Sequence, residues 1–120
     1  MNLLIEKISD LNDMMMQGAF LEAFEAFYDE NIVLQVNDDM PIIGKELNRI
    51  SKKNQFDNII DFKSAKPLKV TVGEQSTMVE WHMNYVHKLH GEKCYTQVAV
   101  QDWSEGKIIK EKLYCGNNQK

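Results

Sequence analysis

The segment from Gln97 to Tyr114 constrains the fold more than any other part of the sequence, because it reads as a β-hairpin. Apolar and polar residues alternate on both sides of residues 104–107, and Gly106 can supply the positive φ that a tight turn requires. A second alternating run, residues 77–89, precedes it and turns at residues 90–92. The sequence therefore predicts three long antiparallel strands in a meander.

Helical patterns come before this meander. Apolar residues recur at helical spacing from Asn2 to Gln17, and Gly18 suits the position that follows a helix end. A second helix is expected from Phe20 to near Asp29, then a strand at residues 32–36 and a short helix after Gly44. Helices followed by a meander predict an α+β fold, in which helices close over a curved sheet and leave a pocket.

The composition limits the kinds of partner and the compartment. A chain of 120 residues suits a single domain, residues 1–120, with a core of its own. The net charge of -4 argues against a nucleic-acid surface, which needs clustered Lys and Arg. Glu6 and the lack of a long apolar run near the start argue against a signal peptide and a membrane span. A cytoplasmic protein with free thiols at Cys94 and Cys115 is expected.

The turns predict which residues of the three strands face each other. With two-residue loops at 91–92 and 105–106, Tyr85 lies opposite Val98, and Val100 lies opposite Glu111. The face expected under the helices carries Val79, Trp81, Met83, Tyr85, Val98, Val100, Ile109, Leu113 and Cys115. The face expected outside carries Glu80, His82, Asn84, Gln97, Ala99, Gln101, Lys110 and Lys112. This outer face is polar, so it is either solvated or a wet subunit interface.

Glu111 is the residue of most chemical interest on the face expected under the helices. An acid that points into an apolar face is costly unless it is paired or near water. Glu111 is therefore either a rim carboxylate bonded to a neighbour or a group that contacts a ligand or transfers a proton. His82 and His87 project to opposite faces of an extended strand, so they do not share a metal. No metal site and no cofactor are predicted.

Five short motifs follow one another along nearly the whole chain. They are Leu21–Phe24, Phe27–Val33, Gly44–Leu47, Asp102–Ile109 and Leu113–Tyr114. In this order they resemble the nuclear transport factor 2-like superfamily, and most of all its SnoaL-like subgroup. The resemblance implies an α+β cone, in which a strongly curved antiparallel sheet forms a cone-shaped barrel around N-terminal helices. It also implies a deep pocket at the open end and a homodimer packed through the convex sheet face.

The superfamily includes polyketide cyclases, steroid isomerases, epoxide hydrolases and binding modules, so the resemblance implies no single function. The steroid isomerases' base carboxylate falls at Val36 or Gln35, and their oxyanion tyrosine falls near Leu11 or Asn12. Their second acid, and the cyclases' acid/base aspartate, fall near Val98 or Val100. None of these residues carries the required group, so isomerase or cyclase chemistry by the known route is not expected.

The leading hypothesis is a protein that binds a small, mostly apolar molecule between the helices and the sheet. The expected ligand-binding residues are Tyr28, Gln35, Trp81, Met83, Tyr85, Val98, Val100, Glu111 and Leu113. One alternative is a lyase, isomerase or cyclase that uses Glu111 as its lone acid/base. A second alternative is a dimeric protein-association module whose pocket is plugged by side chains such as Trp81 and Phe24.

Overall fold

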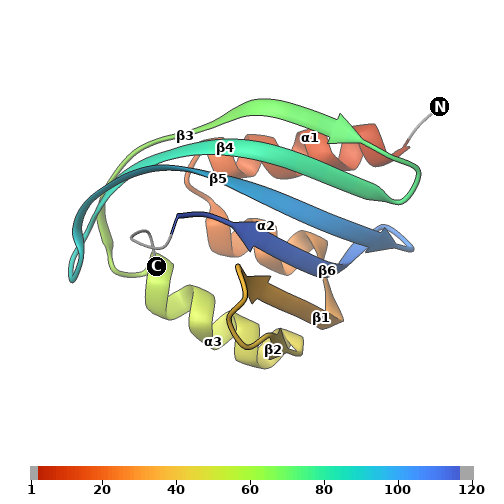
Figure 1. Ribbon diagram of the computed structural model, residues 1–120, viewed down its shortest axis with the longest axis horizontal. Helices are drawn as coiled ribbons and strands as arrows, with labels where there is room; N and C mark the ends of the chain where they lie inside the picture. Colours follow the sequence, from red (N-terminus) through yellow and green to blue (C-terminus); the bar gives the residue numbers. More distant parts are fainter. Residues whose placement is uncertain (1–2, 117–120) are drawn as a thin grey trace.

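The computed structural model describes residues 3–116, and within them three helices lie against a curved sheet (Figure 1). The helices are α1 (Leu3–Met16), α2 (Phe20–Phe27) and α3 (Lys45–Phe56). The strands are β1 (Tyr28–Val36), β2 (Ile42–Ile43), β3 (Ile59–Val72), β4 (Ser76–His87), β5 (Gly91–Ser104) and β6 (Lys107–Tyr114). The first helix was predicted to begin at Asn2, which lies outside the described residues.

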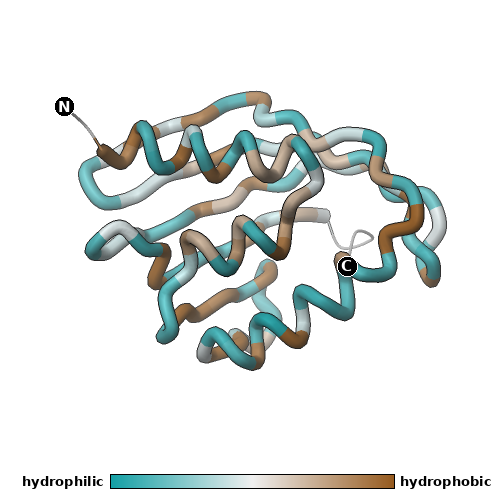
Figure 2. Tube along the Cα trace, turned by 180° about the vertical axis from the view of Figure 1, so that it is seen from behind, coloured by the Kyte–Doolittle hydropathy of each residue, from teal (hydrophilic) through white to brown (hydrophobic). Residues whose placement is uncertain are grey.

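The described strands form one sheet in the order β2-β1-β6-β5-β4-β3. β1 and β6 run parallel, and every other neighbouring pair runs antiparallel. The long strands β3, β4 and β5 bend together, and Figure 2 shows the three helices lying against one face of the sheet. The predicted α+β class, the curved sheet and the three-stranded meander are confirmed.

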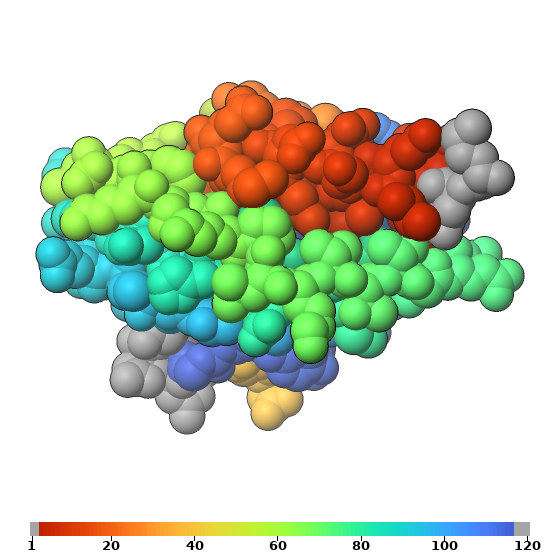
Figure 3. Space-filling view, turned by 90° about the horizontal axis from the view of Figure 1, so that it is seen from above, coloured from red at the N-terminus to blue at the C-terminus, as the bar shows by residue number. Residues whose placement is uncertain are grey.

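Gly18 makes the connection between α1 and α2 short. It has a φ of 78°, and its N–H donates to the carbonyl oxygen of Met15 at 3.0 Å. Glycine adopts this left-handed conformation at little cost, so the first helix stops and the second begins at Phe20. Figure 3 shows α1 in red lying beside β3 in green, and the helix buries Leu11 and Asn12 against the sheet.

The turn between β5 and β6 is the predicted two-residue loop. Ser104 pairs with Lys107, and both loop residues have positive φ, 51° for Glu105 and 79° for Gly106. These angles match the type I′ turn, whose twist suits the twist of the flanking strands. The β-hairpin that the sequence predicts at residues 97–114 is therefore present.

The register predicted between β4 and β5 is wrong, because the loop joining them has three residues, 88–90, rather than two. His87 pairs with Gly91, which has a φ of 71°, as expected where a left-handed residue closes a three-residue loop. Trp81 consequently lies opposite Gln97, and Tyr85 lies opposite Lys93 rather than Val98. The shift covers an odd number of residues, so it turns the whole of β5 over.

Val98 and Val100 therefore face away from the helices, and Gln97, Ala99 and Gln101 face toward them. Ala99 and Gln101 are each 3% exposed. The sequence prediction failed here because side chains alternate along a strand, so any odd slip exchanges the two faces. The inner surface of β5 is more polar than predicted, and its outer surface is more apolar.

A β-bulge near the second turn restores the predicted face of β6. Trp103 pairs with Ile108 and Asp102 with Lys110, so Ile109 is an extra residue in β6. Beyond the bulge Gln101, not Val100, lies opposite Glu111. Glu111 and Leu113 face inward as predicted, whereas Ile109, predicted to face inward, is exposed, and Ile108 is buried.

Two further predictions concern the cysteines and the length of the helices. Cys94 and Cys115 are both free, as predicted, and Cys94 is exposed. No helix within residues 3–116 has the length and apolar character needed to span a membrane.

Candidate functional site

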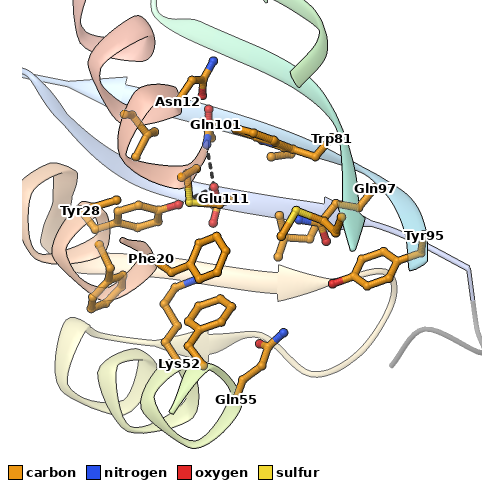
Figure 4. A pocket seen from close by; sticks show the side chains of 18 residues that line it. Asn12, Phe20, Tyr28, Lys52, Gln55, Trp81, Tyr95, Gln97, Gln101 and Glu111 are labelled. Carbon is orange, nitrogen blue, oxygen red and sulfur yellow. Dashed lines mark hydrogen bonds between the residues drawn. The ribbon is translucent and has the colours of Figure 1, made fainter. Parts of the chain in front are cut away.

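Two adjoining cavities lie between the helices and the concave face of the sheet. The inner cavity has a volume of about 60 Å³ and is surrounded by side chains of α1, α2, α3, β1, β4, β5 and β6 (Figure 4). The outer cavity has a volume of about 330 Å³ and is lined at its open side by residues of the β4–β5 loop. The two cavities share Gln55, Tyr95, Gln97 and Leu113 in their walls.

Glu111 is the acid at the inner end of this space, and it is 3% exposed. Its Oε2 accepts hydrogen bonds from the Tyr28 hydroxyl at 2.6 Å and from Gln101 Nε2 at 2.7 Å. Hydrogen bonds to a carboxylate offset part of the cost of removing it from water. No donor among residues 3–116 reaches the other oxygen, Oε1. Glu111 is therefore held in place through one oxygen only.

A chain of buried hydrogen bonds fixes the orientation of the Gln101 amide. The Trp103 indole Nε1–H donates to Thr77 Oγ1 at 2.8 Å, and the Thr77 hydroxyl donates to Gln101 Oε1 at 2.6 Å. The indole N–H can only donate and an ionised carboxylate can only accept, so the two ends together determine the direction of the chain. Gln101 must then present its Nε2 to Glu111. Three side chains from β4 and β5 are thereby ordered beside the carboxylate of β6.

Tyr28 stays protonated next to this carboxylate. Burial raises the pKa of the Tyr28 phenol well above its ordinary value, and the negative charge of Glu111 raises it further. Ionised tyrosine would place a second negative charge beside the carboxylate. Tyr28 therefore acts as a permanent hydrogen-bond donor to Glu111.

Lys52 extends from α3 into the inner cavity, as Figure 4 shows. Its Nζ lies 5.6 Å, 5.5 Å and 5.6 Å from the ring centroids of Phe24, Tyr28 and Phe56. Burial lowers the pKa of the Lys52 amine below its ordinary value, and the negative charge of Glu111 opposes this shift. The cavity thus holds one amine and one carboxylate in a largely aromatic setting.

Asn12 of α1 adds a polar group to the same wall. It is 6% exposed, and within residues 3–116 no protein group forms a hydrogen bond with its side-chain amide. Among the described residues no buried side-chain nitrogen or oxygen lacks a hydrogen-bond partner, so the unpaired amide atoms of Asn12 are accessible rather than buried. The amide therefore contacts the space of the cavity.

The outer cavity carries its own polar pair and a pair of stacked rings. The hydroxyl groups of Tyr85 and Tyr95 are hydrogen bonded at 2.9 Å, and burial raises the pKa of Tyr95 far above its ordinary value. The rings of His87 and His90 stack with their centroids 4.6 Å apart. No cluster of three or more His, Cys, Asp or Glu within residues 3–116 is arranged to hold a metal ion.

The structure brings together most of the side chains predicted for a binding site. Those that line the inner cavity are Tyr28, Trp81, Met83, Glu111 and Leu113, and Tyr85 lines the outer cavity. Val98 and Val100 lie outside, because β5 is turned over relative to the predicted register. Gln35 lines neither cavity, because its Nε2 donates to the carbonyl oxygen of Asp39 at 2.9 Å.

Sequence reasoning missed several polar residues of the cavity wall. They are Asn12, Lys52, Gln55, Tyr95, Gln97 and Gln101. Asn12 carries a weak signal, since it lies four residues after Ile8 on the apolar stripe of α1. Lys52 carries a similar one, because it precedes Phe56 by one helical turn. The other polar residues were assigned to the outer face or to no element.

Neither a protein-family model nor a curated protein sequence matches this chain. Solved structures match its fold. A protein from Mesorhizobium loti assigned to the SnoaL-like polyketide cyclases has a TM-score of 0.75 and 18% identity, with 95% of this chain and 99% of that chain covered. An LEH-like epoxide hydrolase from M. tuberculosis has a TM-score of 0.75 and 11% identity, with 96% and 84% covered.

A nuclear transport factor 2-like protein of unknown function from Burkholderia xenovorans has a TM-score of 0.74 and 13% identity, with 96% of this chain and 87% of that chain covered. At these identities the likeness concerns the fold. The chain has the α+β fold of the SnoaL-like and nuclear transport factor 2-like proteins, as its motifs predicted.

Proposed function

We propose that this protein binds a small, mostly apolar molecule that carries one polar group, with the polar group at Glu111 and Asn12. The observation that supports this most directly is that two polar groups at the inner cavity have no hydrogen-bond partner among residues 3–116. Glu111 Oε1 has no protein donor, and the Asn12 amide has no protein partner. Buried polar groups gain from a partner, and a ligand hydroxyl or amine can donate to Oε1.

The volumes set the size and placement of such a ligand. A dry cavity of about 150 Å³ holds one benzene ring, so about 60 Å³ is too little for a ring without movement of side chains. The ligand therefore extends past Gln97 and Leu113 into the outer cavity of about 330 Å³. Trp81 and Met83 supply apolar surface, and burial of ligand surface contributes about 25 cal/mol per Å².

A thermal-shift series with phenol, benzyl alcohol and longer aromatic alcohols tests this binding. At a ligand concentration of about 100 Kd, the folded state gains about 2.7 kcal/mol, which raises the unfolding temperature. Glu111→Gln loses most of this gain because an amide oxygen is a weaker acceptor than a carboxylate. Gln35→Ala is the matched control, because Gln35 lines neither cavity. Equal ligand stabilisation in both variants would refute the placement of the polar group.

A second candidate is an enzyme in which Glu111 transfers a proton as a lone acid/base. The free Oε1 facing the cavity favours it, because a general base must reach its proton directly. The positions that correspond to the two carboxylates of the steroid isomerases carry Gln35 or Val36 on β1 and Val98 or Val100 on β5, and none of these is an acid. The inward residues of β5 near Glu111 are Ala99 and Gln101, which are not acids either. Product formation from a bound carbonyl compound distinguishes an enzyme from a binding protein.

A homodimer through the outer sheet face is part of the same proposal. Cross-strand neighbours on this face join Met78 to Val100 and Val98 to Tyr114. Met78 is 47% exposed and Tyr114 is 46% exposed. The corrected register thus gathers these four apolar side chains on the outer face, with Glu80 opposite Val98 and Lys112 opposite Val100, and this mixed surface supports a wet subunit interface.

A further inference from the structure

Lys52 is a charged group in the inner cavity that ligand binding at Glu111 and Asn12 does not use. Among residues 3–116 its Nζ has neither a hydrogen-bond acceptor nor an ion-pair partner. Two other long cations of α3, Lys45 and Arg49, are paired. Lys45 Nζ lies 3.1 Å from the Glu25 carbonyl oxygen, and Arg49 forms ion pairs with Glu25 and Glu46.

The aromatic rings around Lys52 contact its amine but do not supply the hydrogen bonds that water would. A lysine ammonium has three donors, and aromatic faces replace only part of the water that they lose. Phe24 and Phe56 bracket the amine, and a methionine would fill the same space without this cost. Burial therefore increases the fraction of neutral amine, and a neutral amine is the nucleophile of lysine chemistry.

We propose that Lys52 forms an imine with the carbonyl carbon of an aldehyde or ketone bound in the inner cavity. The idea rests on the proposed binding site and assigns it a substrate class, an apolar carbonyl compound. The Lys52 lone pair forms a C–N bond while the carbonyl π bond breaks, which gives a carbinolamine. Loss of water then forms the C=N bond. Both hydrogens of the departing water come from the amine, so the balance needs no oxidant or reductant.

Glu111 is the group placed to move these protons. It shares the cavity with Lys52, and its charge acts on the amine. Its free Oε1 can accept a proton from nitrogen and return it to the leaving oxygen. Tyr28 and Gln101 hold the carboxylate through Oε2, so the proton-carrying oxygen stays available.

Reductive trapping tests the imine. The intact protein is treated with benzaldehyde and sodium cyanoborohydride, digested with trypsin and analysed by mass spectrometry for benzylated lysines. Burial lowers the pKa of the Lys52 amine and so increases its neutral fraction, and a carbonyl compound bound in the cavity is held next to it, so Lys52 is expected to be labelled several-fold faster than Lys53. Lys53 is the internal control, because it is exposed and adjacent on the same helix. Lys52→Arg removes this adduct, and Glu111→Gln slows its formation.

The outcomes separate the imine from ligand binding. Benzyl alcohol has the same ring without the carbonyl group, and its thermal shift reports binding alone. If benzyl alcohol stabilises the protein but Lys52 is labelled no faster than Lys53, the imine is refuted and the binding site stands. If Lys52 is labelled selectively and excess benzyl alcohol blocks the labelling, the imine is supported. Labelling of surface lysines only would overturn it.

Discussion

Thr77 shows how a single hydroxyl controls the candidate site without contacting it. Its oxygen accepts a hydrogen bond from Trp103, and its hydroxyl donates one to Gln101. Gln101 in turn donates an N–H to Glu111. Removing that hydroxyl leaves an indole N–H and an amide oxygen unpaired in the core. The Gln101 amide is then held only by its hydrogen bond to Glu111.

Thr77→Val is therefore expected to destabilise the protein by about 1–3 kcal/mol, the usual cost of buried unpaired polar groups. The volume hardly changes, so the loss reports hydrogen bonding rather than a cavity. Urea unfolding of the wild type and the variant measures the free energy of unfolding. Thr71→Val on the exposed part of β3 is the control and is expected to change it by less than about 0.5 kcal/mol. Equal effects of the two substitutions would contradict the chain of donors.

The lowered pKa of Lys52 makes the stability of the protein depend on pH. The sign of this dependence is opposite to the sign expected for a buried tyrosine, whose pKa is raised. The pKa of Lys52 lies below the ordinary value of 10.5 in the folded protein, so in the window up to that value the unfolded chain binds more protons. The free energy of unfolding therefore rises with pH across this window, and the penalty of burying the ammonium is fully present below it. The raised pKa values of Tyr28 and Tyr95 act the other way, above about pH 10.

Lys52→Met removes this titration. The variant is expected to be more stable than the wild type near neutral pH, and the difference is expected to shrink as the pH rises toward the ordinary lysine value of 10.5. Chemical unfolding of both proteins at several pH values measures the difference. A difference that stays constant with pH would show that the amine is not held at a lowered pKa.

Glu111, like its hydrogen-bond partner Tyr28, was predicted from the sequence as a residue of the site, whereas Gln101, Lys52 and Asn12 were not. Glu111 is an acid within an alternating strand, and it faces inward as predicted because the extra residue Ile109 offsets the reversal of β5. Gln101 requires the correct pairing of β5, and Lys52 and Asn12 require the packing of helices on the sheet. Residues that belong to one strand pattern were therefore found, and residues that meet only through tertiary contacts were missed.

At the level of elements, two small backbone features decide which side chains enter the cavity. The three-residue loop before Gly91 turns β5 over, and the extra residue Ile109 turns β6 back. The predicted loop of two residues had the right glycine but gave it the wrong position in the turn. The helices, the strands and the last hairpin followed from local sequence patterns. The sheet face on which each side chain lies depended instead on the exact number of residues in the loop.

Paired substitutions on β5 test this register and the binding site together. Ala99→Leu points into the inner cavity of about 60 Å³ and is expected to abolish the stabilisation by aromatic alcohols, because it fills the space. Val98→Leu adds volume on the outer face and is expected to leave ligand stabilisation unchanged. Thermal shifts measured relative to each variant without ligand give the comparison. The reverse result would restore the register predicted from sequence.

For the whole molecule, the two faces of the sheet differ in what covers them. The concave face, with the helices, encloses the cavities, and the convex face presents the patch of Met78, Val98, Val100 and Tyr114. A stable dimer buries about 800 Å² on each partner. The accessible surface of the chain is 7058 Å², so such an interface takes about a tenth of it. The long strands β4 and β5 provide a continuous surface of this kind.

Val100→Glu is expected to convert the proposed dimer into a monomer, because two copies of the charge would be buried at a shared interface without partners. Light scattering after size-exclusion chromatography measures the mass. Leu47→Glu is the matched control: Leu47 is 59% exposed on α3, away from the sheet, and its substitution is expected to leave the mass unchanged. Binding of aromatic alcohols should survive in monomeric Val100→Glu, because the patch and the cavity lie on opposite faces of β5. A wild type that is monomeric at micromolar concentration would refute the dimer, and loss of binding on dissociation would show that the cavity depends on the partner.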